Sequence, residues 1–265
     1  MRKINPDLKE RLLCGDLNPL LDYIKSDKQL RLEVRTKGEA FVYYRKGLAL
    51  EIGGLKVDKK YGKVPPTDLA IQKPEKYFQQ IKLAIDDWLK SGNNRNEFDT
   101  QQHIAYHNQD INERYFIVDM EYAFEQHQIE KSERLKRAKF DLFGIDMIDG
   151  RMILFELKKG MKSLTGQSGI QDHINDFDKY INGKNSSIFR GSLYRDLKNI
   201  ISDKRDLGLI PDIKLPAIIS TNEPQMIIIF HPINELEELM FKMKYGTLTN
   251  VLIVTDNDFK LKNPY

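Results

Sequence analysis

The chain has 265 residues, of which 40% are hydrophobic, so it is long enough for one large domain or two small ones with a real core. Its one cysteine, Cys14, excludes an internal disulfide and a multi-cysteine zinc site, and its net charge of +3 neither requires nor excludes a nucleic-acid partner. No window approaches the roughly 18 consecutive apolar residues of a membrane helix, and the first residues lack the apolar core of a signal peptide. We therefore expect a cytoplasmic protein without a membrane partner.

Residues 1–95 are expected to form a small α+β domain whose role the sequence leaves open, with DNA binding and partner binding as the options. Leucines at helical spacing in residues 7–26 predict one or two short helices. Four β-prone runs follow, LRLEVR, AFVYYRKG, LALEI and LKVDKKY, and the glycine-containing turns between them indicate an antiparallel meander. A helix is predicted over 74–90, with Pro74 in its first turn, and the polar segment 91–102 after it marks the domain boundary.

Residues 96–265 are expected to form a second domain of the α/β (α+β) class. A helix is predicted over about 111–128, because Glu121 has apolar residues one turn before and after it. Another helix is predicted from the apolar stripe in 170–181. The strands expected near the end of the chain are 217–221, 225–231 and 250–255, with a helix over 235–244 between the last two. Strand, helix, strand predicts a parallel or mixed sheet covered on both faces.

The segment 140–159, FDLFGIDMIDGRMILFELKK, predicts a β-hairpin, because Asp149-Gly150 lies between two β-prone runs. With a two-residue turn, Asp141 lies opposite Lys158. Side chains alternate between faces along a strand, so Asp141, Glu156 and Lys158 share one face. Opposed Cβ atoms lie ~4.5–5.5 Å apart and diagonal ones ~7–8 Å, so the two carboxylates could converge on one divalent cation.

Two alternatives accompany this interpretation. Asp146 is the rival acid; a two-residue turn places it on the other face, and a β-bulge would reverse that assignment. Asp141 and Lys158 could instead form a cross-strand ion pair worth a few tenths of a kcal/mol, with no catalytic role.

An acidic residue on one strand followed by Glu-x-Lys on the next resembles the PD-(D/E)XK nuclease superfamily. Here the pattern reads Asp141, then Glu156-Leu157-Lys158, with Phe140 in place of the proline. The resemblance implies a restriction-endonuclease-like fold and hydrolysis of DNA phosphodiester bonds with Mg²⁺, for which Mn²⁺ can substitute. The catalytic residues that it implies are Asp141, Glu156 and Lys158. The metal ligands that it implies are Asp141, Glu156, the carbonyl group of Leu157 and a glutamate on the preceding helix. Glu121 is the best-placed match for this glutamate, and Glu113 and Glu125 are the alternatives.

Basic residues on both sides of the hairpin favour phosphate contacts, and this series of basic residues continues to Lys204 and Arg205. In the resembled nucleases a polar residue on the helix after Glu-x-Lys also touches the scissile phosphate or a metal-bound water. The residues expected to bind nucleic acid are Arg137, Lys139, Lys159, Lys162, Gln171 and His173.

The predicted function is therefore a Mg²⁺-dependent deoxyribonuclease in defence, restriction or repair. Lys158 would orient the attacking water, stabilise the developing charge or act as the base, and the sequence leaves these roles open. Two alternatives belong to other classes: a nuclease-like fold that binds nucleic acid without cutting it, and an interaction subunit of a larger assembly. A homodimer or larger complex is compatible with each of them.

Overall fold

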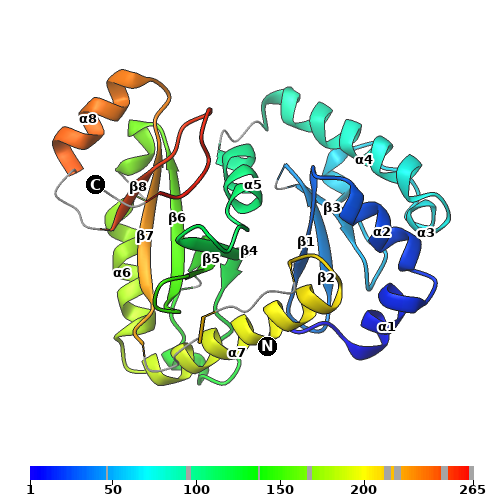
Figure 1. Ribbon diagram of the computed structural model, residues 1–265, viewed down its shortest axis with the longest axis horizontal. Coiled ribbons are helices and arrows are strands. Elements are labelled where there is room, and N and C mark those ends of the chain that lie inside the picture. Colours follow the sequence, from blue (N-terminus) through cyan, green and yellow to red (C-terminus); the bar gives the residue numbers. More distant parts are fainter. Residues whose placement is uncertain are drawn as a thin grey trace. The chain divides into compact units, whose positions relative to one another are not determined.

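The computed structural model describes residues 1–45, 47–93, 97–136, 138–165, 169–211, 216–217, 222–245 and 250–262 (Figure 1). The chain forms two compact units, Met1–Asp99 with Lys198–Asp212, and Thr100–Leu197 with Ile213–Tyr265. Residues 198–212, which lie within the predicted second domain of 96–265, are grouped with the first unit. Among the helices described, none is long and apolar enough to cross a membrane.

The first unit contains the predicted meander. Strands β1 (Leu30–Val34), β2 (Ala40–Tyr44) and β3 (Gly47–Glu51) form a three-stranded antiparallel sheet in that order. The run LKVDKKY was expected to add a strand, and this prediction is wrong. It provides an isolated bridge from Lys56 to Glu51 and then the 3-10 turn η1 (Lys59–Tyr61).

Helices cover this small sheet. They are α1 (Pro6–Cys14), α2 (Asn18–Ser26), α3 (Leu69–Gln72) and α4 (Pro74–Trp88), which is followed by the π-helical turn η2 (Leu89–Asn93). Helix α4 begins at Pro74 as predicted, because proline has no N–H to lose in a first turn. It packs on the meander, where the Tyr77 hydroxyl donates to the carbonyl of Ala49 at 2.8 Å.

The second unit is built on a five-stranded sheet, and this sheet is mixed, one of the two arrangements that the sequence predicted. Its strands lie in the order β4 (Tyr115–Ala123), β5 (Lys139–Asp146), β6 (Met152–Lys159), β7 (Gln225–His231) and β8 (Val251–Ile253). The first three strands are antiparallel, whereas β7 is parallel to β6 and β8 to β7. Residues 218–221 of a further predicted strand lie outside the described residues.

Helices flank this sheet on both faces (Figure 1). They are α5 (Glu97–His107), α6 (Ile170–Ile181), α7 (Ser186–Asp206) and α8 (Glu235–Tyr245), with the short 3-10 turns η3 (Lys131–Glu133) and η4 (Met161–Leu164). Phe241 of α8 stacks on Phe230 at 4.0 Å, and Thr100 of α5 hydrogen-bonds His231 at 2.9 Å. Because Phe230 and His231 are neighbours in β7, α8 and α5 lie on opposite faces.

The predicted helix over 111–128 is wrong, because this segment contains strand β4. Its residues are almost all buried, and it pairs with β5 along most of its length. A strand buried on both faces shows no alternation of apolar and polar residues. Its apolar residues can therefore also fall at the spacing expected for one face of a helix. The aromatic and β-branched residues in YFIVDMEYA were the signal for a strand.

The hairpin exists, but its turn is longer than predicted. The paired stretch of β5 and β6 runs from Ile145–Met152 to Leu142–Phe155. Asp146 bonds Arg151, so residues 147–150 form a four-residue loop instead of the two-residue turn. The register is thus displaced by two positions. Because side chains repeat every two residues, the displacement leaves each strand side chain on its predicted face.

Candidate active site

Three carboxylates occupy one row across the antiparallel part of the sheet. Glu121 lies between the residues of β4 that pair with Phe140 and Leu142, so it is opposite Asp141. Continuing the β5–β6 register from Leu142–Phe155 by one residue places Asp141 opposite Glu156. The corrected register thus brings Asp141 closer to Glu156 than the predicted one did.

The Asp141 side chain replaces a backbone partner of β6. The regular ladder would pair Leu157 with Phe140, but the Leu157 N–H donates to Asp141 Oδ2 at 2.9 Å. In a strand the N–H and C=O groups of one residue point to the same neighbour, so the Leu157 carbonyl also points toward β5. Two kinds of oxygen, a carboxylate and a main-chain carbonyl, are therefore directed into the space between the two strands.

Glu156 is held by one of its two carboxylate oxygens. Lys158 Nζ donates to Oε1 at 2.9 Å, and His173 Nε2 of α6 also lies 2.9 Å from Oε1. The other oxygen, Oε2, is buried and has no hydrogen-bond partner. A buried carboxylate oxygen without a partner costs free energy, so this atom is a natural position for a cation.

The electrostatics of Glu156 lead to the same conclusion. Burial, and next the negative charge of Asp141, raise the pKa of Glu156, although His173 and Lys158 act in the opposite direction. The ionised form of Glu156 is therefore unfavourable beside Asp141. A divalent cation between the two carboxylates would remove this repulsion.

The set of possible metal ligands is small. Among the residues described, no three His, Cys, Asp or Glu side chains are gathered so that they could hold a metal ion. The carboxylate of Glu121 is paired with Lys139, and Glu121 has a backbone φ of 58°. Two carboxylates and a carbonyl suit Mg²⁺, which keeps several waters and accepts one or two carboxylates, better than zinc, which takes nitrogen and sulfur ligands.

Gln101 is a site residue that the sequence analysis missed. This fully buried side chain of α5 donates from Nε2 to the carbonyl of Asp141, and its Oε1 has no hydrogen-bond partner. It fixes the backbone of Asp141 from the other face of the sheet. No local pattern distinguishes Gln101 from its neighbours, since its partner is 40 positions away in the sequence.

The predicted nucleic-acid-binding residues are spread over different places. His173 contacts Glu156, whereas Gln171 is exposed and donates to Asn175 Oδ1 at 2.9 Å. Lys159 follows Lys158 in β6, so its side chain lies on the opposite face of the sheet. There its Nζ lies 3.4 Å from Thr100 Oγ1. Lys139 and Lys162 are exposed, and Lys139 pairs with Glu121. Arg137 lies outside the described residues.

Lys204 corrects the expected extent of the basic series. Its Nζ is buried in the first unit and donates to Glu33 Oε2 at 2.6 Å. A lysine without exposed surface cannot contact phosphate. The position of Lys204 in the sequence gave no sign of this, because α7 contributes residues to both units.

The carboxylate of Asp146, the rival acid, is engaged in hydrogen bonds that hold the hairpin loop. Its Oδ2 accepts from Arg114 Nε and its Oδ1 from the N–H of Ile148, both at 2.9 Å. Each Asp146 oxygen therefore has a hydrogen-bond partner, in contrast to Glu156 Oε2. Asp146 stabilises the hairpin loop.

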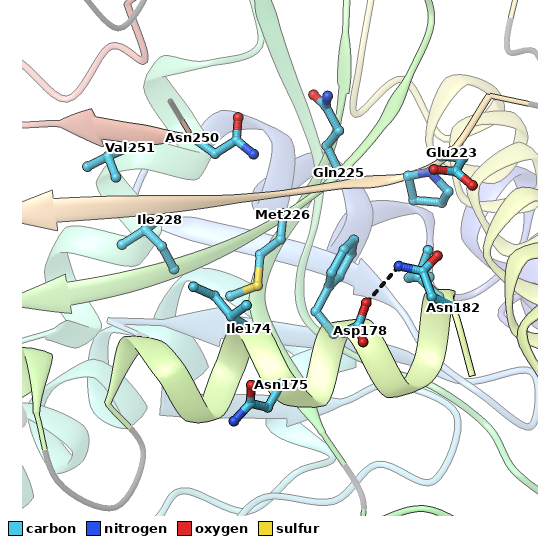
Figure 2. A pocket seen from close by; sticks show the side chains of 13 residues that line it. Ile174, Asn175, Asp178, Asn182, Glu223, Gln225, Met226, Ile228, Asn250 and Val251 are labelled. Carbon is cyan, nitrogen blue, oxygen red and sulfur yellow. Dashed lines mark hydrogen bonds between the residues drawn. The ribbon is translucent and has the colours of Figure 1, made fainter. Parts of the chain in front are cut away.

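A cavity of about 560 Å³ lies between α6 and strands β7 and β8 (Figure 2). Ile228 lines it and is the register partner of Glu156, so the cavity lies one strand from Glu156 on the α6 face. Other apolar lining residues are Ile174, Met226 and Val251. Polar groups around it belong to Asn175, Asp178, Asn182, Glu223, Gln225 and Asn250. This size and mixture of groups is typical of sites for small molecules or parts of larger substrates.

Comparison of the chain with protein-family models, with curated proteins and with solved structures finds no match. The functional assignment therefore depends on the residues and geometry of this site.

Proposed function

We propose that this protein is a Mg²⁺-dependent phosphodiesterase that hydrolyses DNA at the site formed by Asp141, Glu156 and Lys158. The observation that carries the proposal is Glu156 Oε2, a buried oxygen without a hydrogen-bond partner on a carboxylate whose pKa is raised by burial and by Asp141. Most buried polar groups in proteins are hydrogen-bonded, and acids with perturbed pKa values gather at functional sites.

Asp141, Glu156 and the Leu157 carbonyl would hold the Mg²⁺. When bound, this ion supplies Lewis acidity to a phosphoryl oxygen and lowers the pKa of a water molecule. Lys158 donates to Oε1 of Glu156 and His173 Nε2 lies 2.9 Å from the same oxygen, so both basic groups contact Oε1 and not Oε2. The Lys158 ammonium group also provides positive charge for the negative charge that develops on the phosphate.

The fold supports the same reaction class. A mixed five-stranded sheet flanked by helices is the arrangement that resemblance to PD-(D/E)XK nucleases implies, and this chain has such a sheet. The acidic residue and Glu-x-Lys lie on adjacent strands β5 and β6, as in the pattern. A restriction-endonuclease-like fold is accordingly part of the proposal.

The cavity extends the proposal to substrate contacts. A nucleotide whose phosphate lies at Glu156 would place its sugar and base toward Ile228 and the cavity. The carboxamide group of Asn250, at the edge of the cavity, can pair with the donors and acceptors of a base edge. The cavity would therefore hold the nucleoside next to the scissile phosphate.

The test compares wild type with Glu156→Gln on supercoiled plasmid, linear duplex and single-stranded DNA, in Mg²⁺, Mn²⁺ or EDTA. Glu33→Gln is the matched control, because Glu33 is also a buried glutamate that bonds a buried lysine but lies in the first unit. We expect metal-dependent products from wild type and from Glu33→Gln, and none from Glu156→Gln. Salt-sensitive DNA binding without products would instead assign the chain to the non-cutting binders.

A further inference from the structure

Helix α8 has a second apolar face that points away from the sheet. One face is buried, where Phe241 is 2% exposed and stacks on Phe230. The apolar residues of the other face are Leu236, Leu239, Met240 and Met243, which are 65%, 56%, 47% and 81% exposed. Their spacing of three and four residues places all of them on one side of the helix.

This face differs from ordinary exposure of single apolar residues. Leu83 of α4 is also 65% exposed, but the residues three and four positions from it are Gln79, Gln80, Asp86 and Asp87. Leu83 is thus an isolated leucine on a polar surface, which is normal in globular proteins. Four adjacent exposed apolar side chains on α8 form a continuous patch, and such patches mark interaction surfaces.

The charges on α8 indicate which partner fits the patch. The first turn is acidic, with Glu235, Glu237 and Glu238, and the last turn is basic, with Lys242 and Lys244. Lys242 bonds Glu238 at 2.7 Å within the helix, and Glu237 Oε2 accepts from the N–H of Ile233 at 3.0 Å. The acidic and basic ends lie on either side of a midpoint between Leu239 and Met240. The charges of helix α8 are therefore complementary to those of an antiparallel copy of the same helix.

An antiparallel copy of α8 satisfies every part of this pattern. It places Leu236 against Met243 of the other copy and Leu239 against Met240. On a helical wheel Glu235 and Lys242 border one side of the patch, and Glu237 and Lys244 border the other. In the antiparallel arrangement, opposite charges meet on both sides. A parallel arrangement would bring glutamates together and lysines together, which is unfavourable.

We propose that a second copy of this chain covers the exposed face of α8 and forms a homodimer with twofold symmetry. In a twofold interface the same patch serves both subunits, so self-complementarity is the property that it requires. Helix α8 has 11 residues and is roughly 16 Å long. This places the interface at the small end of specific contacts, and we expect a dissociation constant on the order of micromolar.

Sedimentation velocity over a range of concentrations tests the dimer. Wild type should move from the 31.0 kDa of one chain toward twice that mass as concentration rises. Leu236→Glu should remain a monomer at every concentration, because it places a charge against the apolar Met243 of the other copy in each half of the contact. The matched control Leu83→Glu, at an equally exposed leucine, should dimerise as wild type does. A monomeric wild type, or a dimeric Leu236→Glu, would overturn the proposal.

Cysteine cross-linking tests the antiparallel direction in a Cys14→Ser background, since Cys14 is free and exposed. Positions 236 and 243 are about 10 Å apart along one helix, too far for an internal disulfide. The double variant Leu236→Cys with Met243→Cys should form a covalent dimer on oxidation, and Leu236→Cys alone should not. Cross-linking of the single variant at full yield, with none gained from the second cysteine, would contradict the antiparallel arrangement.

Discussion

Two substitutions of Asp141 separate its role in the fold from its role in metal binding. Asp141 Oδ2 accepts the N–H of Leu157, which is buried, at 2.9 Å. Asp141→Ala removes this acceptor, and an unsatisfied buried N–H costs about 1–3 kcal/mol. A loss of 1 kcal/mol lowers Tm by about 2–4 °C in chains of similar size, so we expect Asp141→Ala to lower Tm by about 2–12 °C. Asp141→Asn keeps an oxygen acceptor and should unfold near the wild-type temperature.

Addition of Mg²⁺ should then raise the Tm of wild type but not that of either Asp141 variant. A ligand at about 100 times its Kd stabilises the folded state by about 2.7 kcal/mol, which corresponds to a gain of about 5–11 °C. We expect this gain in wild type and in the control Asp146→Asn, and no gain in either Asp141 variant. Asp146 suits the control because its carboxylate is engaged by Arg114 and by the hairpin loop.

Scanning calorimetry is the appropriate assay. The single tryptophan, Trp88, belongs to α4 of the first unit, so its fluorescence follows that unit, whereas calorimetry also records the second. An equal gain from Mg²⁺ in Asp141→Asn and in wild type would contradict metal binding by Asp141. Equal unfolding temperatures of the two Asp141 variants in EDTA would contradict the structural role of its hydrogen bond to Leu157.

Three further predictions concern the same site. Because the pKa of Glu156 is raised in the folded state, protonation of Glu156 stabilises the metal-free fold. The free energy of unfolding in EDTA should therefore fall as pH rises from the ordinary glutamate pKa through the pKa of Glu156. Mg²⁺ affinity, measured by titration calorimetry, should rise over that window, and Glu156→Gln should abolish both trends. Lys158→Met removes the partner of a buried carboxylate and should cost about 3–5 kcal/mol in urea unfolding at neutral pH, with a smaller loss where Glu156 is protonated. Ile174→Trp should fill the cavity beside β7 and raise KM for cleavage while Mg²⁺ affinity stays at the wild-type value; unchanged KM would separate the cavity from the substrate.

The hairpin illustrates how much of the site local sequence could predict. Asp149-Gly150 correctly indicated a turn between two strands, but the turn length depends on side-chain caps. Asp146 Oδ1 accepts from the N–H of Ile148 and Asp149 Oδ1 from that of Arg151, and these bonds stabilise a four-residue loop. The predicted face of Glu156 and Lys158 survived because the error was an even number of residues.

The surroundings of the hairpin depended on contacts that are distant in sequence. Glu121 was selected on a helix, yet it lies on a strand opposite Asp141, and the pairing of β4 with β5 decided this. The contacts of Gln101 with Asp141 and of Lys204 with Glu33 join residues 40 and 171 positions apart. Periodicity and turn signals describe neighbours along the chain, so they could not reveal such partners.

Cleavage of supercoiled plasmid by wild type and by Glu156→Gln, each in Mg²⁺ and in EDTA, tests the central claim most directly. The proposed site predicts nicked or linear plasmid from wild type in Mg²⁺, and a rate at least about 100-fold lower in Glu156→Gln and in EDTA. Equal cleavage by both proteins in Mg²⁺, or an intact plasmid with wild type that folds and binds Mg²⁺, would contradict it.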